Sequence, residues 1–504
     1  TQLNVMWAFV NVVFEPNLLV SRLPPPRYIG TSGHRQAEIR YPRQARRGLT
    51  ACCCKSPIEL GSASLPHDTA PPGEFTIVGG GICGFFVALL LAQMGRRVRL
   101  FERGSAKPAG QFGFLLNSRG LRALRAYDPS FVGRLSQFGN PTTNLSVIVG
   151  GRRVSETSVN GVTVLRATFL EEMFKDVDQY SDLISVHHNH KLLGLDSSRR
   201  LLTFEKTDTS EVFSLHASCV IACDGNYSCV RKELAESDGG EHAAFSPSVT
   251  PWGFSIRCVS IMRDLDGFDV GTHYVYADIG YMCRVAATRW VLALQVDDTV
   301  PAHSFLNSTE PTESNMLKLH ARISAASAAA GVPELELTES ELASFFMSKK
   351  VTGALVDVPT LAVGDWMVLA GDAAHAVSPF AGEGANASLE DAVILADAIR
   401  LAGRDWLEEF NRVRCADVHA LFRIARYRNA GIAGSPVERA DYFVDSILIS
   451  LCRRLGVFDA TQKELMQTTG DQVRAYTFLE KLHKEQLSLV SPMSSLFKGF
   501  VRMA

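Results

Sequence analysis

The sequence lacks any apolar run of the length a membrane-spanning helix needs, about 18 residues or more. The nearest approach, Val5–Val20, is interrupted by Glu15 and Pro16. It also lacks an excess of charge of either sign. Because the formal net charge is only -2, nucleic acid is not expected as a partner, and membrane association has weak support.

Paired cysteines are also missing. No Cys-x-x-Cys pair occurs, and the 11 cysteines include three consecutive ones, Cys52, Cys53 and Cys54. Disulfide frameworks and zinc sites use cysteines at regular, paired spacings. We therefore expect reduced thiols that serve mainly in packing, and no metal site. With 46% hydrophobic and 21% charged residues over 504 positions, the composition is that of a globular protein with two or three domains.

Residues 1–72 differ from the rest of the chain. They are rich in arginine, poor in acidic residues and without clear periodicity, and they contain Pro24-Pro25-Pro26. Such a composition is typical of a mitochondrial or plastid transit peptide, or of a disordered leader. The sequence therefore leaves an organelle and the cytoplasm both open as the location, and the folded part is expected to begin at residue 73.

The first strong pattern, residues 75–102, predicts a strand, a helix and a second strand. These elements are Phe75–Val78, Phe85–Met94 and Val98–Phe101. Gly79, Gly81 and Gly84 form a GxGxxG turn between the first two elements, and Glu102 ends the second strand. An acid about 20 residues after such a turn can bind a ribose hydroxyl. The unit predicts a dinucleotide site, and Glu102 favours FAD or NAD over NADP.

A second pattern lies far along the chain, in residues 366–397. A short apolar run ends at Gly371-Asp372, a loop with Pro379, Gly382 and Gly384 follows, and a helix is predicted from Asn386 on. Glycines admit a ligand close to the backbone, and a helix start attracts negative charge. A strand-end carboxylate can accept hydrogen bonds from a polyol chain. This combination suits a flavin; the alternative is an ordinary strand–turn–helix connection with a structural aspartate.

A third strand end lies between these two patterns. The buried run Cys219–Ala222 leads to Asp224-Gly225 at the start of a helix. Together with the two other patterns, this predicts three strand ends around one extended cofactor. Arg166, before a predicted helix, could reach a pyrophosphate; the alternative is a surface salt bridge.

The overall pattern predicts an α/β protein in which a Rossmann-like FAD-binding domain is interleaved with an antiparallel-sheet substrate domain and followed by C-terminal helices. Residues 252–297 contain several short β-rich runs, which indicate the antiparallel sheet. Residues 114–126 are predicted to be helical. The expected division is 1–72 leader, 73–248 FAD-binding domain with interleaved substrate-domain strands, 249–350 substrate domain, 351–430 return to the FAD-binding domain, and 431–504 C-terminal helices.

These motifs, in this order, resemble the single-component FAD-dependent aromatic hydroxylases of the para-hydroxybenzoate hydroxylase-like fold. The likeness covers about residues 75–430 and is greatest to the kynurenine 3-monooxygenase family. It rests on the segments VHHNHKLLGLD (186–196), VIACDGNYSCVR (220–231), GDAAHAVSPFAGEGANASLEDA (371–392) and FNRVRCADVHAL (410–421).

The resemblance implies a role for each matching position. Near the FAD pyrophosphate and adenosine it places Gly79, Gly81, Cys83, Gly84, Glu102, Arg103, Arg166 and Leu192. It assigns Asp224-Gly225 to FAD and, transiently, to the reduced nicotinamide. It places Asp372 on the ribityl chain, and Gly384, Ala385 and Asn386 near the flavin ring.

The implied chemistry is that of a monooxygenase. NAD(P)H would reduce FAD, and dioxygen would add to give a C4a-hydroperoxyflavin that transfers one oxygen atom to an aromatic or polyene small molecule. Pro379 would pack close to the flavin ring. His375 is a candidate acid–base group, although a structural role in the GDAAH turn is favoured. A reductase on the same fold and a flavin-binding protein without turnover remain alternatives.

The chain departs from the family where the substrate carboxylate is bound. The position of the family's carboxylate-binding arginine falls near Leu145, that of a tyrosine near Asn160, and that of an asparagine near Arg428. No arginine lies between Arg134 and Arg152. A buried carboxylate without a cationic partner is costly. We therefore expect a substrate less anionic than kynurenine.

Overall fold

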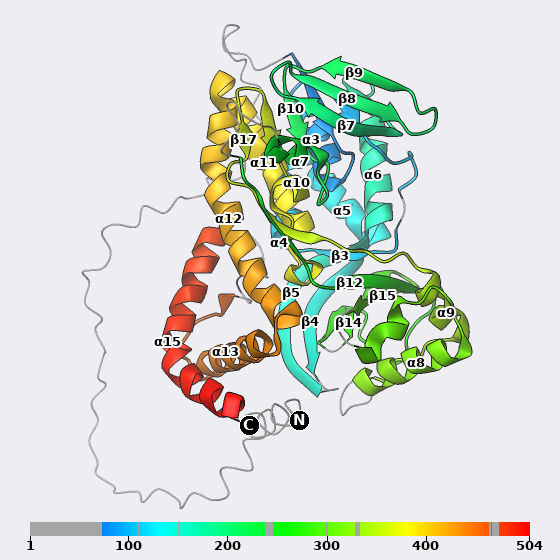
Figure 1. Ribbon diagram of the computed structural model, residues 1–504, viewed down its shortest axis with the longest axis vertical. Helices are drawn as coiled ribbons and strands as arrows, with labels where there is room; N and C mark the ends of the chain where they lie inside the picture. The colour runs from blue at the N-terminus through cyan, green and yellow to red at the C-terminus, as the bar shows by residue number, and fades with distance from the viewer. Residues whose placement is uncertain are drawn as a thin grey trace, which may run out of the picture. The chain divides into compact units, whose positions relative to one another are not determined.

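The computed structural model describes residues 73–503 except 109, 150–151, 237–244, 278, 298–300, 328–332, 463–464 and 466–472 (Figure 1). Among the described residues, one compact unit runs up to Ser494 and contains all of the sheets. The predicted leader, residues 1–72, lies outside the described residues.

A six-stranded sheet forms the centre of the FAD-binding half. Its order is β17-β18-β10-β1-β2-β6, and all pairings are parallel except β17 with β18. The strands are β1 (Glu74–Val78), β2 (Arg97–Phe101), β6 (Ile184–His187), β10 (Val220–Ala222), β17 (Ala362–Val363) and β18 (Met367–Leu369). Because β1, β10 and β18 are parallel neighbours, their carboxyl ends meet at one edge. The three motifs predicted to surround one cofactor follow these three strands.

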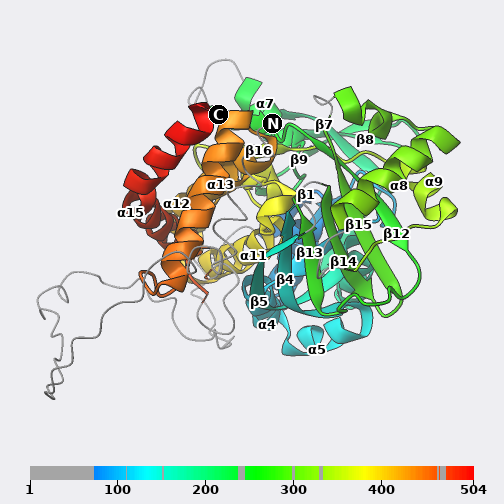
Figure 2. The same cartoon turned by 90° about the horizontal axis from the view of Figure 1, so that it is seen from below.

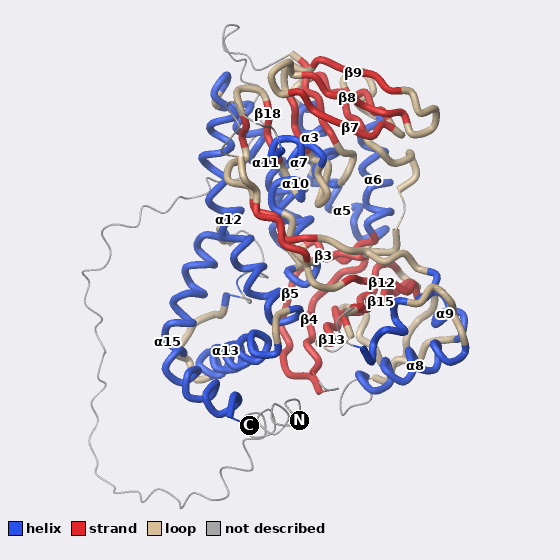
Figure 3. The backbone as a smooth tube through the Cα atoms, in the orientation of Figure 1, coloured by secondary structure: helices blue, strands red, loops and turns tan. Residues whose placement is uncertain are grey.

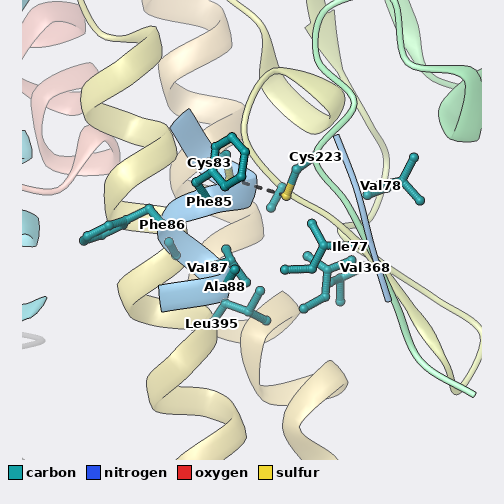
Figure 4. Packing of buried hydrophobic residues seen from close by; sticks show 14 of the residues in the cluster. Ile77, Val78, Cys83, Phe85, Phe86, Val87, Ala88, Cys223, Val368 and Leu395 are labelled. Carbon is teal, nitrogen blue, oxygen red and sulfur yellow. Dashed lines mark hydrogen bonds between the residues drawn. The ribbon is translucent and has the colours of Figure 1, made fainter. Parts of the chain in front are cut away.

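Helices cover this sheet through apolar contacts. α3 (Ile82–Gln93) is buried along most of its length because it packs on the sheet and against α6 (Arg166–Asp178) and α11 (Gly384–Leu401). Figure 4 shows Phe85, Phe86, Val87 and Ala88 of α3 among Ile77, Val368 and Leu395. A helix that is apolar on all sides is stable only when it is enclosed in this way.

A seven-stranded sheet forms the second half, in the order β12-β15-β14-β13-β4-β5-β3. Its strands are β3 (Gly113–Leu116), β4 (Asn140–Val149), β5 (Arg152–Leu165), β12 (Ser255–Ile261), β13 (Thr272–Tyr276), β14 (Gly280–Ala286) and β15 (Arg289–Val296). One face packs under α8 (Glu313–Ser327) and α9 (Glu339–Met347), which lie beside the strands in Figure 2. The other face carries Tyr281 and Cys283 toward α12 (Trp406–Ala433) and η3 (Pro379–Ala381).

The chain passes between the two large sheets repeatedly. β3, β4 and β5 are inserted between β2 and β6 of the first sheet, and β12 to β15 are inserted between β10 and β17. The interleaved α/β fold class is therefore confirmed. Two small sheets complete the strands, β7-β8-β9 and β11-β16, and Figure 3 shows the former apart from the seven-stranded sheet. Their strands are β7 (His190–Asp196), β8 (Leu201–Lys206), β9 (Val212–His216), β11 (Ser248–Pro251) and β16 (Ala354–Asp357).

The remaining helices connect and cover these sheets. They are α4 (Ser118–Tyr127), α5 (Pro129–Phe138), α7 (Cys229–Glu236), α10 (Asp372–His375), α13 (Pro436–Arg454) and α15 (Tyr476–Met503), with short η2 (Pro301–Asn307) and η4 (Gly403–Asp405). α12 packs along α11 and α13. Within the described part of the chain, no helix combines the length and the apolar character that crossing a bilayer requires.

One local prediction was wrong. Residues 114–116, predicted to be helical, belong to β3, because they pair with the end of β5; the helix begins only after Asn117, whose side chain caps it by accepting from Arg119 N. The antiparallel sheet predicted within residues 252–297 is confirmed, because β12, β15, β14 and β13 pair antiparallel in this order; β13 also pairs in parallel with β4. Strands β4 and β5 are longer than their apolar cores because the pairing between them continues through polar positions.

Candidate active site

The turn between β1 and α3 brings its backbone close to the neighbouring strand end. Gly79 has φ +102°, and a Cβ there would lie 2.4 Å from Cys223 O. A Cβ on Gly84 would lie 1.9 Å from Gly79 O. Gly81 precedes the helix and no side chain caps its first N–H groups. These N–H groups, with the positive end of the α3 dipole, form a site suited to a phosphate.

Glu102 stands at the end of β2, beside this turn. Its carboxylate accepts from Gly80 N over 2.6 Å and from Gly104 N over 2.7 Å. These bonds fix the carboxylate against the turn and leave further lone pairs for a ribose hydroxyl. The next residue, Arg103, is exposed.

Arg166, the first residue of α6, supplies a cation at the same place. Its Nη2 lies 3.8 Å from the position of a Cβ on Gly81. Among the described residues, no hydrogen bond or ion pair holds its guanidinium. Burial lowers its pKa, against the opposing effect of the Glu102 and Asp372 carboxylates. A partly buried cation without a partner beside a phosphate-type turn is suited to a pyrophosphate.

Asp372 follows β18, which is separated from β1 in the sheet by β10. Its carboxylate receives no hydrogen bond from any described residue, and Oδ1 lies 3.7 Å from the position of a Cβ on Gly384. Burial raises its pKa, while His375 and Arg166 oppose that rise. Such an acceptor, held between two turns, is suited to ligand hydroxyls.

Asp224 stands at the strand end between these two. Its Oδ2 accepts from Val230 N over 3.1 Å, whereas its Oδ1 is buried and has no partner among the described residues. Burial raises the pKa of this carboxyl. The turn continues through Gly225 at φ +83°. Arg231 then donates to Ala373 O over 2.8 Å, which ties this loop to the Asp372 segment.

The predicted flavin-ring segment is a tight turn that ends in a helix start. After η3, Gly382 is left-handed with φ +70°, and α11 begins at Gly384 without a side-chain cap. Ala385 is half-buried. Asn386 accepts from Asn117 N and donates to Leu115 O and Gly382 O, each over 3.0 Å. The Asn386 side chain is therefore used by the protein itself, and it fixes the turn against β3.

His375 lies in the interior rather than toward the strand ends. Its Nε2 contacts Asp391 Oδ2 over 2.5 Å, and Asp391 also accepts from Gly371 N and Arg414 Nε, each over 2.7 Å. His375 is only 1% exposed. This placement favours its structural role over acid–base chemistry.

The other predicted residues occupy supporting positions. Pro379 begins η3 and is half-buried, and Leu192 is a buried packing residue of β7. Cys83 is buried under the first turn, with its Sγ 3.6 Å from Cys223 Sγ (Figure 4). The structure thus brings the glycine turn, Arg166 and Asp372 together.

Sequence reasoning missed Glu383 and its partners. Glu383 is buried between Gly382 and Gly384, and it accepts from Asn117 Nδ2 over 2.9 Å and from Tyr476 Oη over 2.8 Å. Burial raises its pKa, and Arg119 opposes the rise. The only signal in the sequence was an acidic residue between two turn glycines. An acidic side chain in such a turn is ordinarily expected to be exposed to solvent, so the signal did not indicate burial.

The arrangement fits FAD on its own features. An uncapped helix start and an unpaired cation suit a pyrophosphate, and carboxylates at strand ends, one without any donor, suit ribose and ribityl hydroxyls. No group of His, Cys, Asp and Glu among the described residues could hold a metal ion.

Comparisons with known proteins point to the same cofactor. The family model "FAD binding domain" matches residues 74–416. The chain is 27% identical over 378 residues to a kynurenine 3-monooxygenase of Anopheles gambiae, covering 71% of this chain and 74% of the relative.

Two solved structures share the fold. The p-nitrophenol 4-monooxygenase PnpA from Pseudomonas putida DLL-E4 has a TM-score of 0.57 at 18% identity, over 73% of this chain and 91% of that one. A variant of HpxO of Klebsiella pneumoniae, complexed with FAD, has a TM-score of 0.53 at 20% identity, over 76% and 98%. The chain belongs to the FAD binding domain family and is a flavoprotein oxidoreductase of the FAD-dependent monooxygenase type.

Proposed function

We propose that this protein uses NAD(P)H and dioxygen to insert one oxygen atom into an uncharged aromatic or polyene small molecule. The proposal rests on the presence of two side chains, Arg166 and Asp372, that lack partners in the described part of the chain and lie at the same site. Both are ionisable side chains, held at the glycine turn and at the start of α11, and neither forms a hydrogen bond or ion pair through its side chain with a described residue. A ligand that carries both an anion and hydroxyl groups would provide the partners that this guanidinium and this carboxyl group lack.

FAD, when bound, would supply the redox chemistry, namely hydride acceptance from reduced nicotinamide and activation of dioxygen. The chain's own residues position it. Gly81 and Arg166 would bind the pyrophosphate, Glu102 and Asp372 would bind hydroxyls, and the uncapped start of α11, at Gly384 and Ala385, would lie by the ring. Because Asn386 and Glu383 fix this turn from behind, its N–H groups are held in place before the cofactor arrives.

A substrate beside the ring would meet an aromatic environment. Phe380, in η3, lies 5.4 Å from the Phe254 ring and 6.2 Å from the Tyr281 ring, between centroids. Cys258, Cys283 and Val291 extend this apolar face of the sheet. An apolar and aromatic surface of this kind favours aromatic or polyene ligands, and it expels water from the place where oxygen is transferred.

Only one GxGxxG turn occurs in the sequence, and Asp224-Gly225 lies at the strand end between the other two. We therefore infer that reduced nicotinamide is bound transiently near this same site. The proposal does not depend on membrane attachment or on residues 1–72.

The test is NADH or NADPH oxidation by the FAD-loaded protein, with dioxygen consumption and peroxide measured together. Oxidation that a neutral aromatic stimulates, with less than one peroxide formed per nicotinamide, is the expected result. Stimulated oxidation with all oxygen recovered as peroxide would indicate a reductase instead. Bound FAD that NADH and NADPH both fail to reduce would indicate a flavin-binding protein without turnover.

A further inference from the structure

The inference concerns His273, on β13 in the middle of the seven-stranded sheet. Its side chain is half-buried, its Nδ1 is buried without a partner, and no hydrogen bond involves its ring among the described residues. Burial lowers its pKa to about 4. The imidazole is therefore neutral near pH 7, with one donor nitrogen and one acceptor nitrogen.

A neutral, partly buried imidazole without a hydrogen-bond partner needs an explanation. Buried polar groups are almost always hydrogen-bonded, because leaving one unpaired costs free energy. The other unpaired polar atoms around the proposed cofactor site, on Asp224 and Asp372, lie at strand ends where ligand groups are expected. His273 is far along the chain from those strand ends and lies in the other sheet.

The position of His273 connects it to the proposed ring site. Its ring centroid is 5.2 Å from that of Tyr281, and Tyr281 is 6.2 Å from Phe380, next to the turn that begins α11. Tyr281 donates its hydroxyl to Gly113 O over 3.3 Å. A molecule that packs against Tyr281 and Phe380 would therefore find the unpaired polar atoms on His273.

Among the described residues, the strand neighbours of His273 offer no cation; the arginine close to η3 is Arg428 of α12, which donates to an η3 carbonyl over 3.3 Å. In the register of the parallel pair, His273 stands opposite Leu145, and the next position on the same face pairs Val275 with Val147. All three of these neighbours are apolar and half-buried. Burial is the cause of the lowered pKa of His273, without a charged neighbour. A carboxylate placed against His273 itself, between these apolar neighbours, would be desolvated without a countercharge from the sheet, which is unfavourable.

We propose that His273 binds the substrate of this protein through an uncharged hydrogen-bonding group, a carbonyl, hydroxyl or amino group carried by an aromatic ring that packs against Tyr281 and Phe380. This inference rests on the proposed function, because it places the substrate beside the flavin turn. It narrows the substrate to neutral aromatics that carry a polar substituent, and it disfavours aromatic carboxylates.

The test compares two probes of similar size, neutral 2-aminoacetophenone and anionic 2-aminobenzoate. Each is titrated into the full-length FAD-loaded protein, and the flavin absorbance change gives Kd. We expect the neutral probe to bind at least about tenfold more tightly, which is the worth of about one hydrogen bond. In His273→Leu the neutral probe should bind about tenfold more weakly, and in His273→Asn it should regain most of that loss.

His273→Arg should reverse the preference, because it adds the missing cation opposite Leu145. His216→Leu is the matched control, since His216 is an exposed histidine at the end of β9, and its probe affinities should be unchanged. FAD content and reduction by NADH are measured for every variant. The FAD content should remain that of the unaltered protein, because these variants leave the residues proposed to hold FAD unchanged.

The outcomes separate the two proposals. Unaltered protein that retains and reduces FAD but binds the carboxylate probe as tightly as the neutral one, or binds neither, overturns the role of His273 and leaves the monooxygenase proposal standing. The same holds if His273→Leu binds the neutral probe unchanged. Protein that fails to bind or reduce FAD contradicts the proposed function itself.

Discussion

Tyr476 donates a hydrogen bond of 2.8 Å to Glu383, 93 residues earlier in the chain. Tyr476 is the first residue of α15 and is fully buried, and the guanidinium of Arg119 lies 3.9 Å from the centre of its ring. Glu383 occupies the turn that begins α11. The start of the last helix thus supports the turn that is proposed to face the flavin ring.

Removing this hydroxyl should loosen the turn. In Tyr476→Phe the ring still packs, but Glu383 loses one of its donors, so we expect a loss of about 1–2 kcal/mol in unfolding free energy and weaker FAD binding. Urea unfolding and FAD fluorescence titration measure the two effects. Tyr442→Phe is the control, because the Tyr442 hydroxyl has no hydrogen bond to any described residue. Equal results for both variants would contradict the role of Tyr476.

Arg166 is predicted to serve the cofactor and not the fold. Arg166→Met removes a partly buried cation without a protein partner among the described residues, so the FAD-free protein should be no less stable. FAD affinity should fall on the order of 100-fold, because a charge-assisted bond to phosphate is lost. Equilibrium dialysis gives the affinity and calorimetry gives the stability, with the exposed Arg97→Met as control. An unchanged affinity for FAD would exclude Arg166 from the pyrophosphate site.

Gly84 is predicted to tolerate no side chain. A Cβ at this position would lie 1.9 Å from Gly79 O, so Gly84→Ala should cost more than about 3 kcal/mol and abolish FAD retention. Gly133, exposed inside α5, has nothing within 4 Å of its Cβ position. Gly133→Ala should therefore stabilise the protein by roughly 0.5–1 kcal/mol. Thermal unfolding of both variants checks the contrast, which similar melting temperatures would refute.

The free energy of unfolding should fall at acid pH because Glu390 and Asp391 of α11 form a buried charge network with arginines and a histidine. Burial opposes ionisation, but Arg119 and Arg414 lower the pKa of Glu390 to about 2, and His375 and Arg414 lower that of Asp391 to about 2. Both values lie below the ordinary 4.5 and 3.8. The stabilisation is therefore complete above the ordinary values and is lost as the pH falls through them toward about 2.

Urea unfolding between about pH 6 and pH 2 measures this loss, which should be roughly 2–3 kcal/mol per carboxylate once the pH reaches the folded value. Asp391→Asn should be less stable near neutrality and show a shallower decline with acid. Glu408→Gln, at an exposed position of α12, should keep the slope of the unaltered protein. A flat profile for the unaltered protein would contradict the account of the network.

Much of the cofactor site could be predicted from sequence because its signals are local. The glycine turn with Glu102, the Asp224 strand end and the Asp372 strand end are each legible within about 30 residues, and parallel pairing brings them to one edge. The interleaving of the two sheets was predicted from the β-rich runs that interrupt the FAD-binding pattern.

The features that sequence could not reveal depend on distant partners. Residues 114–116 are apolar and fit a helix, yet pairing with β5 makes them a strand. Glu383 and Tyr476 meet across most of the C-terminal region, and no local pattern indicates that a glutamate between two glycines is buried. The role proposed for His273 depends on its parallel pairing with Leu145, and the periodicity of a sequence does not reveal which strands pair.

The central claim is that this site transfers oxygen from dioxygen to an organic molecule. The most direct measurement is a reaction of the FAD-loaded protein with NADH or NADPH under ¹⁸O₂, with neutral aromatics and L-kynurenine as candidate substrates and mass spectrometry of the product. The account predicts one ¹⁸O atom in the product of a neutral aromatic. Oxidised nicotinamide with all of the ¹⁸O recovered in peroxide or water, for every candidate, would contradict it.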